Sequence, residues 1–154
     1  MDIAEVLQHT SPELFLPELE AGDKAEVLTE LVAGLVAGSP TITKPDAVLQ
    51  MLESREALGS TAVGPGVAFP HGRTLAVQHL TVLIARSTKG VDFDSADDEK
   101  THLFFVLIAP PQDSGHKYIK SLAALTEKLQ NDSLREALLA AADYESFCTA
   151  LKEA

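Results

Sequence analysis

His71 is the residue in this sequence best placed to do chemistry, because it lies between Pro70 and Gly72. Pro70 fixes its own φ angle and pushes the residue before it towards an extended conformation, while Gly72 permits a sharp turn or the close approach of another backbone. Upstream, a turn at 64–66 precedes the segment 67–69, which has strand propensity. An imidazole held in this way at a strand end is both fixed and reachable, as a nucleophile must be. The alternative is an ordinary solvated turn, because proline and glycine mark turns in most proteins.

Arg55 and His116 are the other two residues whose type and position suit the binding of an anion. Arg55 continues the apolar stripe of an expected helix into a guanidinium, and His116 lies in the first turn of another expected helix, in line with its apolar stripe. A helix start attracts phosphate, an arginine offers it a planar charged donor, and a histidine with a free ring nitrogen is a nucleophile towards phosphorus. The three residues together describe a place for a phosphoryl group carried on His71. The sequence alone does not show that they meet in space, and Arg55 could equally be a rim arginine whose stem covers apolar surface.

The elements that must position these residues are alternating helices and strands. Apolar periodicity predicts helices at 3–8 and 23–38, a helix from 43 that ends at 59, a helix that begins at 113 or 114 and ends before 131, and two further helices that begin near 132 and after 143. Strands are predicted at 14–16, 67–69, 79–85, 91–93 and 103–108. The last of these is apolar on both faces, which is typical of a central strand covered on both sides. This alternation indicates an α/β layered domain.

Two of these helices carry the candidate residues. Thr43 is expected to cap the helix that contains Arg55. The helix that contains His116 is expected to begin at a cap formed by Asp113 or Ser114. Its inner stripe would consist of Ile119, Leu122, Ala123, Thr126 and Leu129.

The composition is that of an ordinary globular protein with an acidic surface. The 154 residues are 45% hydrophobic and 23% charged, which predicts one domain, 1–154, with a sizeable core. A net charge of −11 argues against a nucleic acid or an anionic membrane as partner, since both would repel the protein, and solubility is the favoured explanation of the acidity. Cys148, the only cysteine, lies on an apolar helical stripe and is expected to be a core residue rather than a nucleophile. The sequence has no secretion-signal pattern and no apolar run of membrane-spanning length, so a cytoplasmic location is expected.

A resemblance to a known family is carried by the runs 55–61, REALGST, and 64–72, GPGVAFPHG. They resemble the signature of the IIA domains of the bacterial sugar phosphotransferase system, specifically the fructose–mannitol type that includes the nitrogen-regulatory IIA proteins. The resemblance extends over nearly the whole chain, through the segment VDFD at 91–94, the apolar strand at 103–109 and a histidine that opens the next helix. Phe69 is bulkier than the isoleucine or valine usual at its position.

The resemblance implies a fold and a set of roles. The fold would be an α/β sandwich around a mixed β-sheet with helices on both faces. His71 matches the histidine that accepts a phosphoryl group from the phosphocarrier protein HPr and passes it to a IIB cysteine, so the chain would be a phosphotransferase component acting through phosphohistidine. Arg55 matches the arginine that braces the site, His116 a second histidine beside the first, and Thr61 a site-lining threonine that supports phosphoryl binding. The resemblance implies neither a metal nor an organic cofactor.

Two other functions remain open at this point. The first is a nitrogen-regulatory IIA protein, in which the phosphorylation state of His71 decides which regulatory partner is bound; the same histidine serves both functions, so the site does not separate them. The second is a zinc site formed by His71, His79, His102 and His116, which the sequence supports weakly because no pair has a compact ligand spacing.

Overall fold

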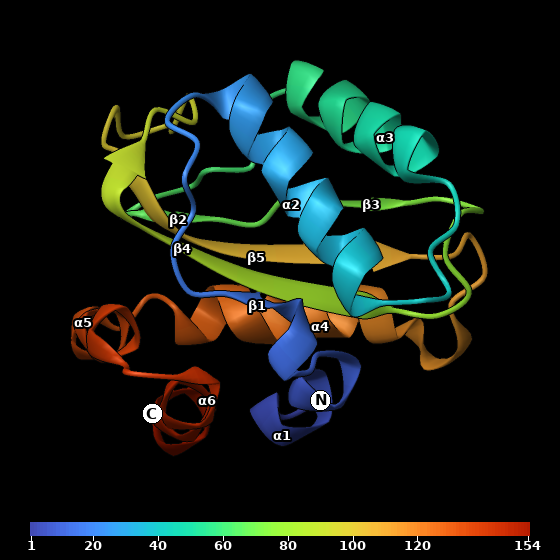
Figure 1. Ribbon diagram of the computed structural model, residues 1–154. Coiled ribbons are helices and arrows are strands. Elements are labelled where there is room, and N and C mark those ends of the chain that lie inside the picture. Colours follow the sequence, from blue (N-terminus) through green and yellow to red (C-terminus); the bar gives the residue numbers. More distant parts are fainter.

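A computed structural model, which describes residues 1–154, shows a mixed five-stranded sheet between two layers of helices (Figure 1). The strands are β1 (Phe15–Leu16), β2 (Val67–Ala68), β3 (His71–Arg73), β4 (Thr81–Val91) and β5 (Thr101–Ala109). They lie in the order β1-β4-β5-β2, and β3 also pairs with β5. Strands β4 and β5 are antiparallel, whereas β1 runs parallel to β4, and β2 and β3 run parallel to β5. The predicted fold class, an α/β fold whose mixed sheet is flanked by helices on both faces, is confirmed.

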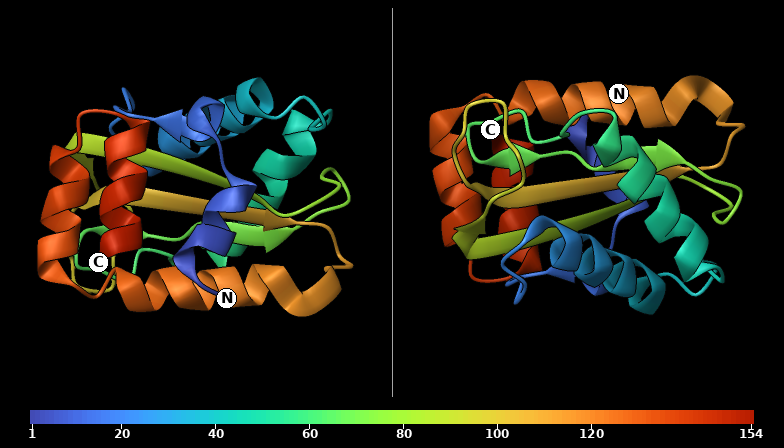
Figure 2. Two further views of the ribbon diagram at one scale, coloured as in Figure 1. Left: turned by 90° about the horizontal axis from the view of Figure 1, so that it is seen from below. Right: turned by 90° about the horizontal axis from the view of Figure 1, so that it is seen from above.

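The helices form two layers. Helices α2 (Lys24–Gly38) and α3 (Pro45–Ala57) cover one face of the sheet, and α1 (Ile3–Val6), α4 (Lys117–Lys128), α5 (Asp132–Ala140) and α6 (Tyr144–Glu153) cover the other (Figure 1). Short 3-10 helices connect longer elements at η1 (Leu7–His9), η2 (Pro12–Leu14) and η3 (Ser114–His116). Seen from above, α3 crosses over β3, and α4 runs along the same edge of the sheet (Figure 2). No helix is both long and apolar enough to cross a membrane.

Strand β5 supplies both halves of the hydrophobic core. Its side chains alternate between a cluster of 20 buried residues under α2 and α3, which Phe104 joins, and a cluster of 18 buried residues on the opposite face, which Phe105 joins. Every residue from Leu103 to Ala109 is buried. Burial of one such phenylalanine side chain stabilises the fold by about 1.5–3 kcal/mol. The predicted central strand, covered on both faces, is therefore confirmed.

Strands β2 and β3 form one interrupted edge strand, because both run parallel to β5 and pair with successive parts of it. The interruption falls at Pro70, which has no N–H to donate to a neighbouring strand. The Pro70 carbonyl still accepts a hydrogen bond from the backbone N of Leu107 at 2.9 Å, so the chain stays beside β5 across the break. His71 follows β2, as predicted, but it also begins β3, which was not predicted.

Two other predicted boundaries are wrong. Strand β4 is continuous from Thr81 to Val91 and is not divided into strands at 79–85 and 91–93, because pairing with β5 resumes at Val91 after an irregularity that follows Arg86. Helix α3 begins at Pro45 with Lys44 at the N-cap position, where no side chain caps the helix, so Thr43 is not its cap. Proline at the first helical position needs no hydrogen-bond partner for its nitrogen and has the φ angle of a helix.

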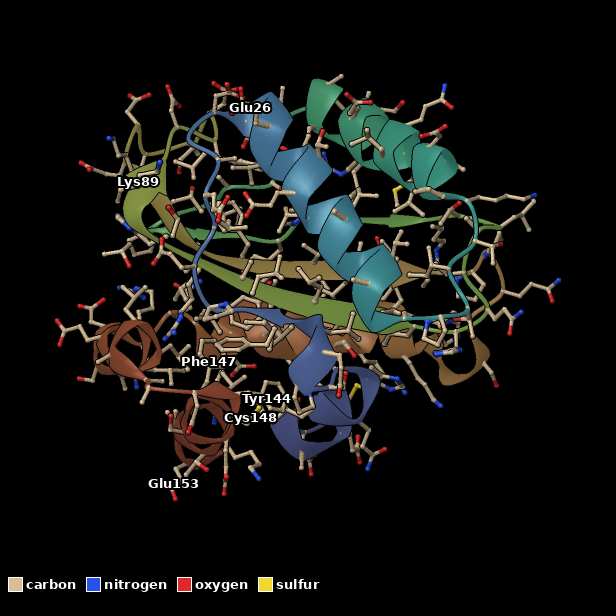
Figure 3. All side chains as sticks on the ribbon, in the orientation of Figure 1. Glu26, Lys89, Tyr144, Phe147, Cys148 and Glu153 are labelled. Carbon is tan, nitrogen blue, oxygen red and sulfur yellow. The ribbon has the colours of Figure 1, made fainter.

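Cys148 lies on α6 beside Phe147 and Tyr144, in the layer that α6 shares with α1 (Figure 3). The side chain is buried, and this burial raises the pKa of the Cys148 thiol. A protonated, buried thiol is a poor nucleophile. The prediction of a core cysteine is confirmed.

Candidate functional site

His71 is half-buried, and its Nδ1 lies 2.6 Å from the carbonyl oxygen of Phe69. A carbonyl oxygen can only accept a hydrogen bond, so Nδ1 is the nitrogen that carries the proton in the neutral ring. Nε2 then keeps its lone pair, which makes it the nucleophilic atom of this side chain. The segment that holds the ring is itself fixed, since the backbone N of Phe69 donates to the carbonyl of Thr61 at 3.1 Å.

Gly72 allows helix α3 to pack directly on the strand that carries His71. A Cβ atom at Gly72 would lie only 2.0 Å from Sδ of Met51, on α3. Any side chain at this position would therefore have to displace Met51. Arg55 lies one helical turn beyond Met51 on α3, and residues four apart share one face of a helix. The close packing at Gly72 thus brings the arginine's side of α3 to the edge formed by β2 and β3.

Arg55 is half-buried and is anchored at the end of its helix. Its Nη1 donates a hydrogen bond to the carbonyl oxygen of Gly59 at 2.8 Å. Its positive charge also acts on Tyr118, where it opposes the rise in pKa that burial causes. The guanidinium is therefore held at the C-terminal end of α3, within electrostatic reach of Tyr118 on α4.

Thr61 is joined to a buried carboxylate. Both its hydroxyl and its backbone N donate to Glu56, the N–H to Oε1 at 3.1 Å, and Nζ of Lys24 lies 2.9 Å from the same oxygen. Thr61 is only 3% exposed. It reaches the histidine segment through its carbonyl, which accepts from Phe69. The direct support of a phosphoryl group by Thr61 remains a prediction.

Glu56 is a residue of this network that sequence reasoning missed. A signal was present, because Glu56 follows Val48 and Leu52 at intervals of four and is buried with them on the inner face of α3. A carboxylate on such a stripe must find partners, since an unpaired buried charge is costly. Lys24 and Thr61 are those partners.

His116 precedes α4 and does not lie in its first turn. It ends η3, has a left-handed backbone with φ of 55°, and is exposed. The predicted inner stripe of α4 is correct only in part. Leu122 and Leu129 pack in the core, but Ile119 is 52% exposed, and the buried residues within the helix are Tyr118, Ser121 and Leu125. The reason lies at the helix start, where the Asp113 carboxylate accepts a hydrogen bond from the backbone N of Tyr118 at 2.6 Å. His116 is therefore an exposed residue just before α4 rather than a member of its inner stripe.

The aromatic ring packed beside His71 belongs to Tyr118, with the two ring centroids 6.1 Å apart. Cζ of Arg73, on β3, lies 4.6 Å from the centroid of the same tyrosine ring. Burial raises the pKa of the Tyr118 hydroxyl, and the nearby charges of Arg73 and Arg55 oppose this rise. Sequence reasoning missed both Tyr118 and Arg73. The sequence held one signal for Arg73: it lies two residues after His71, and residues two apart share one face of a strand.

The structure thus brings His71, Arg55, Arg73 and Tyr118 to one edge of the sheet, between α3 and α4. No three His, Cys, Asp or Glu side chains are grouped so that they could hold a metal ion. The edge combines a nucleophilic imidazole with guanidinium groups, which suits chemistry on a phosphoryl group or another small anion.

Comparisons with known proteins cover nearly the whole chain. Residues 8–154 match the family described as "Phosphoenolpyruvate-dependent sugar phosphotransferase system, EIIA 2". A nitrogen regulatory protein from Bradyrhizobium diazoefficiens is 36% identical over 141 residues, which are 92% of this chain and 90% of the relative. The fructose-specific EIIA component of a phosphotransferase system from Haloferax volcanii is 33% identical over 153 residues, which are 99% of this chain and 98% of the relative. The crystal structure of the nitrogen regulatory protein IIA-Ntr from Neisseria meningitidis matches with a TM-score of 0.87 and 28% identity, covering 96% of this chain and 99% of that one.

Proposed function

Since the chain belongs to the EIIA 2 family of the phosphoenolpyruvate-dependent sugar phosphotransferase system, we propose that it is a phosphocarrier whose His71 accepts a phosphoryl group from HPr and passes it to the cysteine of a IIB protein. The observation that carries this proposal is the environment of His71, where the hydrogen bond from Nδ1 to the carbonyl of Phe69 holds the ring at a sheet edge that also carries the Arg73 guanidinium on Tyr118. This bond fixes the ring and leaves Nε2 free to attack phosphorus. The proposed transfer needs no metal ion and no organic cofactor.

In the acceptance step, the Nε2 lone pair of His71 forms a bond to the phosphorus of the donor phosphohistidine while the donor's N–P bond breaks. The electron pair of the broken bond returns to the donor imidazole. Positive charge develops on the His71 ring, and this strengthens the hydrogen bond from Nδ1 to the Phe69 carbonyl. The carbonyl therefore stabilises the phosphorylated ring more than the free one, which is the requirement for helping the transfer.

In the donation step, a thiolate of the IIB protein attacks phosphorus, and the N–P bond at His71 breaks. Its electron pair returns to Nε2, so the ring becomes neutral while Nδ1 keeps its proton. Neither step requires a proton to leave the Phe69 hydrogen bond. The site can consequently run in both directions without reorienting the ring.

Three other residues have supporting roles in this proposal. Arg55 braces the phosphoryl oxygens with its guanidinium, which is planar and permanently charged. His116 acts as the second imidazole, donating a hydrogen bond as phosphorus moves between nitrogen and sulfur. Thr61 supports phosphoryl binding from the segment that its carbonyl links to Phe69.

The test is phosphorylation of the purified chain with phosphoenolpyruvate, enzyme I and HPr, followed by intact-protein mass spectrometry. Wild type should gain one acid-labile phosphoryl group, and His71→Ala should gain none. His102→Ala is the matched control, because Nδ1 of His102 also lies against a backbone carbonyl, that of Ser87 at 2.8 Å. This control should be phosphorylated like wild type. Normal phosphorylation of His71→Ala would refute the assignment.

A second candidate function is regulation, in which the phosphorylation state of His71 controls the binding of a regulatory partner rather than sugar uptake. The similarity to nitrogen regulatory proteins, in both sequence and structure, favours it. The two functions differ in the step after phosphorylation. A sugar-specific IIA protein should transfer its phosphoryl group to a IIB cysteine. A regulatory protein should instead bind a target with different affinity before and after phosphorylation.

A further inference from the structure

Arg73 lies where a second cation of the phosphoryl site would be needed. It belongs to β3 two residues after His71, so the two side chains leave the same face of the strand. Arg73 is exposed, and its one hydrogen bond runs from Nη1 to the carbonyl of Pro110 at 3.3 Å. Guanidinium has five N–H donors, so most of those of Arg73 remain available for an anion.

Tyr118 holds this arginine beside the histidine. Tyr118 is 5% exposed, and its backbone N is fixed by the Asp113 carboxylate at 2.6 Å. The same ring packs against His71, at 6.1 Å between centroids, and carries the Arg73 guanidinium 4.6 Å from its centroid. A guanidinium stacked on a fixed aromatic ring loses little conformational entropy when it binds an anion, because much of its freedom is already lost.

Arg55 brings one positive charge to the site, whereas a phosphoryl group on His71 carries nearly two negative charges. One of its donors, Nη1, is bonded to the carbonyl of Gly59 at 2.8 Å, at the end of its own helix. The protein as a whole carries a net charge of −11, which opposes the arrival of a phosphoryl dianion. A second guanidinium, from β3 rather than α3, would counter both effects.

We propose that Arg73, held by the ring of Tyr118, is a second phosphoryl-binding arginine of this site. The inference rests on the proposed phosphorylation of His71. In the phosphorylated protein the Arg73 guanidinium donates hydrogen bonds to phosphoryl oxygens, while Tyr118 acts as a positioning residue that keeps the guanidinium stacked beside the histidine.

The experiment uses the full chain in five versions: wild type, Arg73→Ala, Arg73→Lys, Tyr118→Leu and Tyr118→Phe. Lys152→Ala is the control, because it removes an exposed positive charge from α6 without touching this edge. Acceptance is measured in a single turnover from phosphorylated HPr, and the ³¹P resonance of each phosphorylated variant is recorded after the donor has been removed. Circular dichroism checks that each variant is folded.

Arg73→Ala should accept the phosphoryl group roughly 10- to 100-fold more slowly, as expected for one lost hydrogen bond to a charged group. Its ³¹P resonance should shift from that of wild type. Arg73→Lys should recover part of the rate, since lysine supplies charge but no planar fork. Tyr118→Leu should lose part of the rate, Tyr118→Phe should keep it because the stacking ring is retained, and Lys152→Ala should match wild type in both measurements.

The inference and the function on which it rests fail in different ways. A wild-type rate and an unchanged ³¹P resonance in folded Arg73→Ala, with His71 still phosphorylated, would overturn the role of Arg73 alone. The small donor phosphoramidate is used in parallel, so that the ³¹P comparison does not depend on HPr. If both phosphorylated HPr and phosphoramidate place the phosphoryl group on a residue other than His71, the proposed function is overturned, and the inference with it.

Discussion

His71 and His102 lie on neighbouring strands and are oriented in the same way. Each is half-buried, and each places Nδ1 against a backbone carbonyl, at 2.6 Å from Phe69 for His71 and at 2.8 Å from Ser87 for His102. In both neutral rings Nδ1 carries the proton and Nε2 keeps its lone pair. Orientation by a carbonyl therefore does not by itself distinguish a candidate nucleophile from a structural histidine.

The glycine near each histidine makes room for a different neighbour. A Cβ at Gly90 would lie 2.8 Å from Cε1 and 3.1 Å from Nε2 of His102, so the backbone of Gly90 packs against the edge of the ring that a nucleophile would use. A Cβ at Gly72 would instead meet Sδ of Met51 at 2.0 Å. The glycine next to His71 thus accommodates helix α3 and not the imidazole.

The charges around the two histidines also differ. His102 lines a cavity of about 390 Å³ together with Asp132, Arg135 and Glu136, in which two carboxylates outnumber the one guanidinium. The sheet edge at His71 instead carries the guanidinium groups of Arg55 and Arg73. A phosphoryl dianion would be repelled at the first position and attracted at the second. Packing and charge around Nε2, more than the orientation of the ring, therefore distinguish the candidate nucleophile from the structural histidine.

The largest expected effect comes from removing positive charge at the His71 edge. Arg55→Ala should cost about 2–4 kcal/mol of transition-state stabilisation, roughly 30- to 1000-fold in the rate of phosphoryl transfer, by analogy with the loss of an oxyanion-hole donor. Phosphorylation itself should persist, because Nε2 of His71 remains. Arg55→Lys should restore the rate only in part.

Single-turnover transfer from phosphorylated HPr measures this effect. Arg135→Ala is the control, since it removes the arginine of the His102 cavity and should leave the rate unchanged. A wild-type rate in Arg55→Ala would make Arg55 a rim arginine whose stem covers apolar surface.

The two glycines should differ in their contribution to stability. Gly90 has a φ of 83° and packs against His102, so Gly90→Ala combines backbone strain with overpacking and should lower the free energy of unfolding by about 2–4 kcal/mol. Gly72 has no such backbone requirement, and Gly72→Ala needs only a new rotamer of Met51, at about 0.5–1.5 kcal/mol.

Urea denaturation of the single and double variants separates the contribution of backbone strain from that of steric overlap. Met51→Ala should remove the penalty of Gly72→Ala, because the clashing sulfur is gone. His102→Ala should relieve Gly90→Ala only in part, because the backbone strain remains. Equal losses for the two glycine variants would contradict the contrast drawn between the two histidines.

The parts of the fold that could be predicted from the sequence are those with a local pattern. Strand β5 is apolar on both faces, so only a central position can bury it, and α2 shows the helical period of Leu28, Leu31 and Leu35. The division of the edge strand into β2 and β3 could not be predicted in the same way. It depends on the pairing of both pieces with β5, which is distant in the sequence.

In the candidate site too, residues with a local sequence pattern could be predicted, and residues that depend on long-range packing could not. His71 and Arg55 belong to one short run and have distinctive neighbours, whereas Arg73 and Tyr118 gain their meaning only when α4 packs beside β3. The phase of α4 was predicted only in part because its buried residues include Tyr118 and Ser121, which an apolar pattern underweights. His116 was placed on the inner stripe for the same reason.

His9 extends the comparison to an imidazole in a third environment. Burial lowers its pKa from the ordinary value of 6.5, the positive charges of Lys117 and His79 lower it further, and Asp113 and a hydrogen bond with the backbone of Leu80 oppose the change. Between the lowered value and 6.5 the unfolded chain binds more protons than the folded one. The stability that neutral His9 provides is therefore complete above about pH 6.5 and is lost as the pH falls through the lowered pKa.

The smallest expected effect is the loss of stability at acid pH that follows from the lowered pKa of His9. Acidification from neutral pH to about pH 5 should lower the urea midpoint of wild type more than that of His9→Gln, because glutamine binds no proton. His79→Gln should reduce the fall by a smaller amount, since it removes only one of the charges that act on His9. The contributions of other titrating groups cancel in the difference between wild type and His9→Gln. The plots of urea midpoint against pH therefore need not be flat for either protein. Parallel curves for wild type and His9→Gln would mean that His9 takes up its proton equally well in the folded and the unfolded chain, and that burial beside Lys117 and His79 does not set its charge.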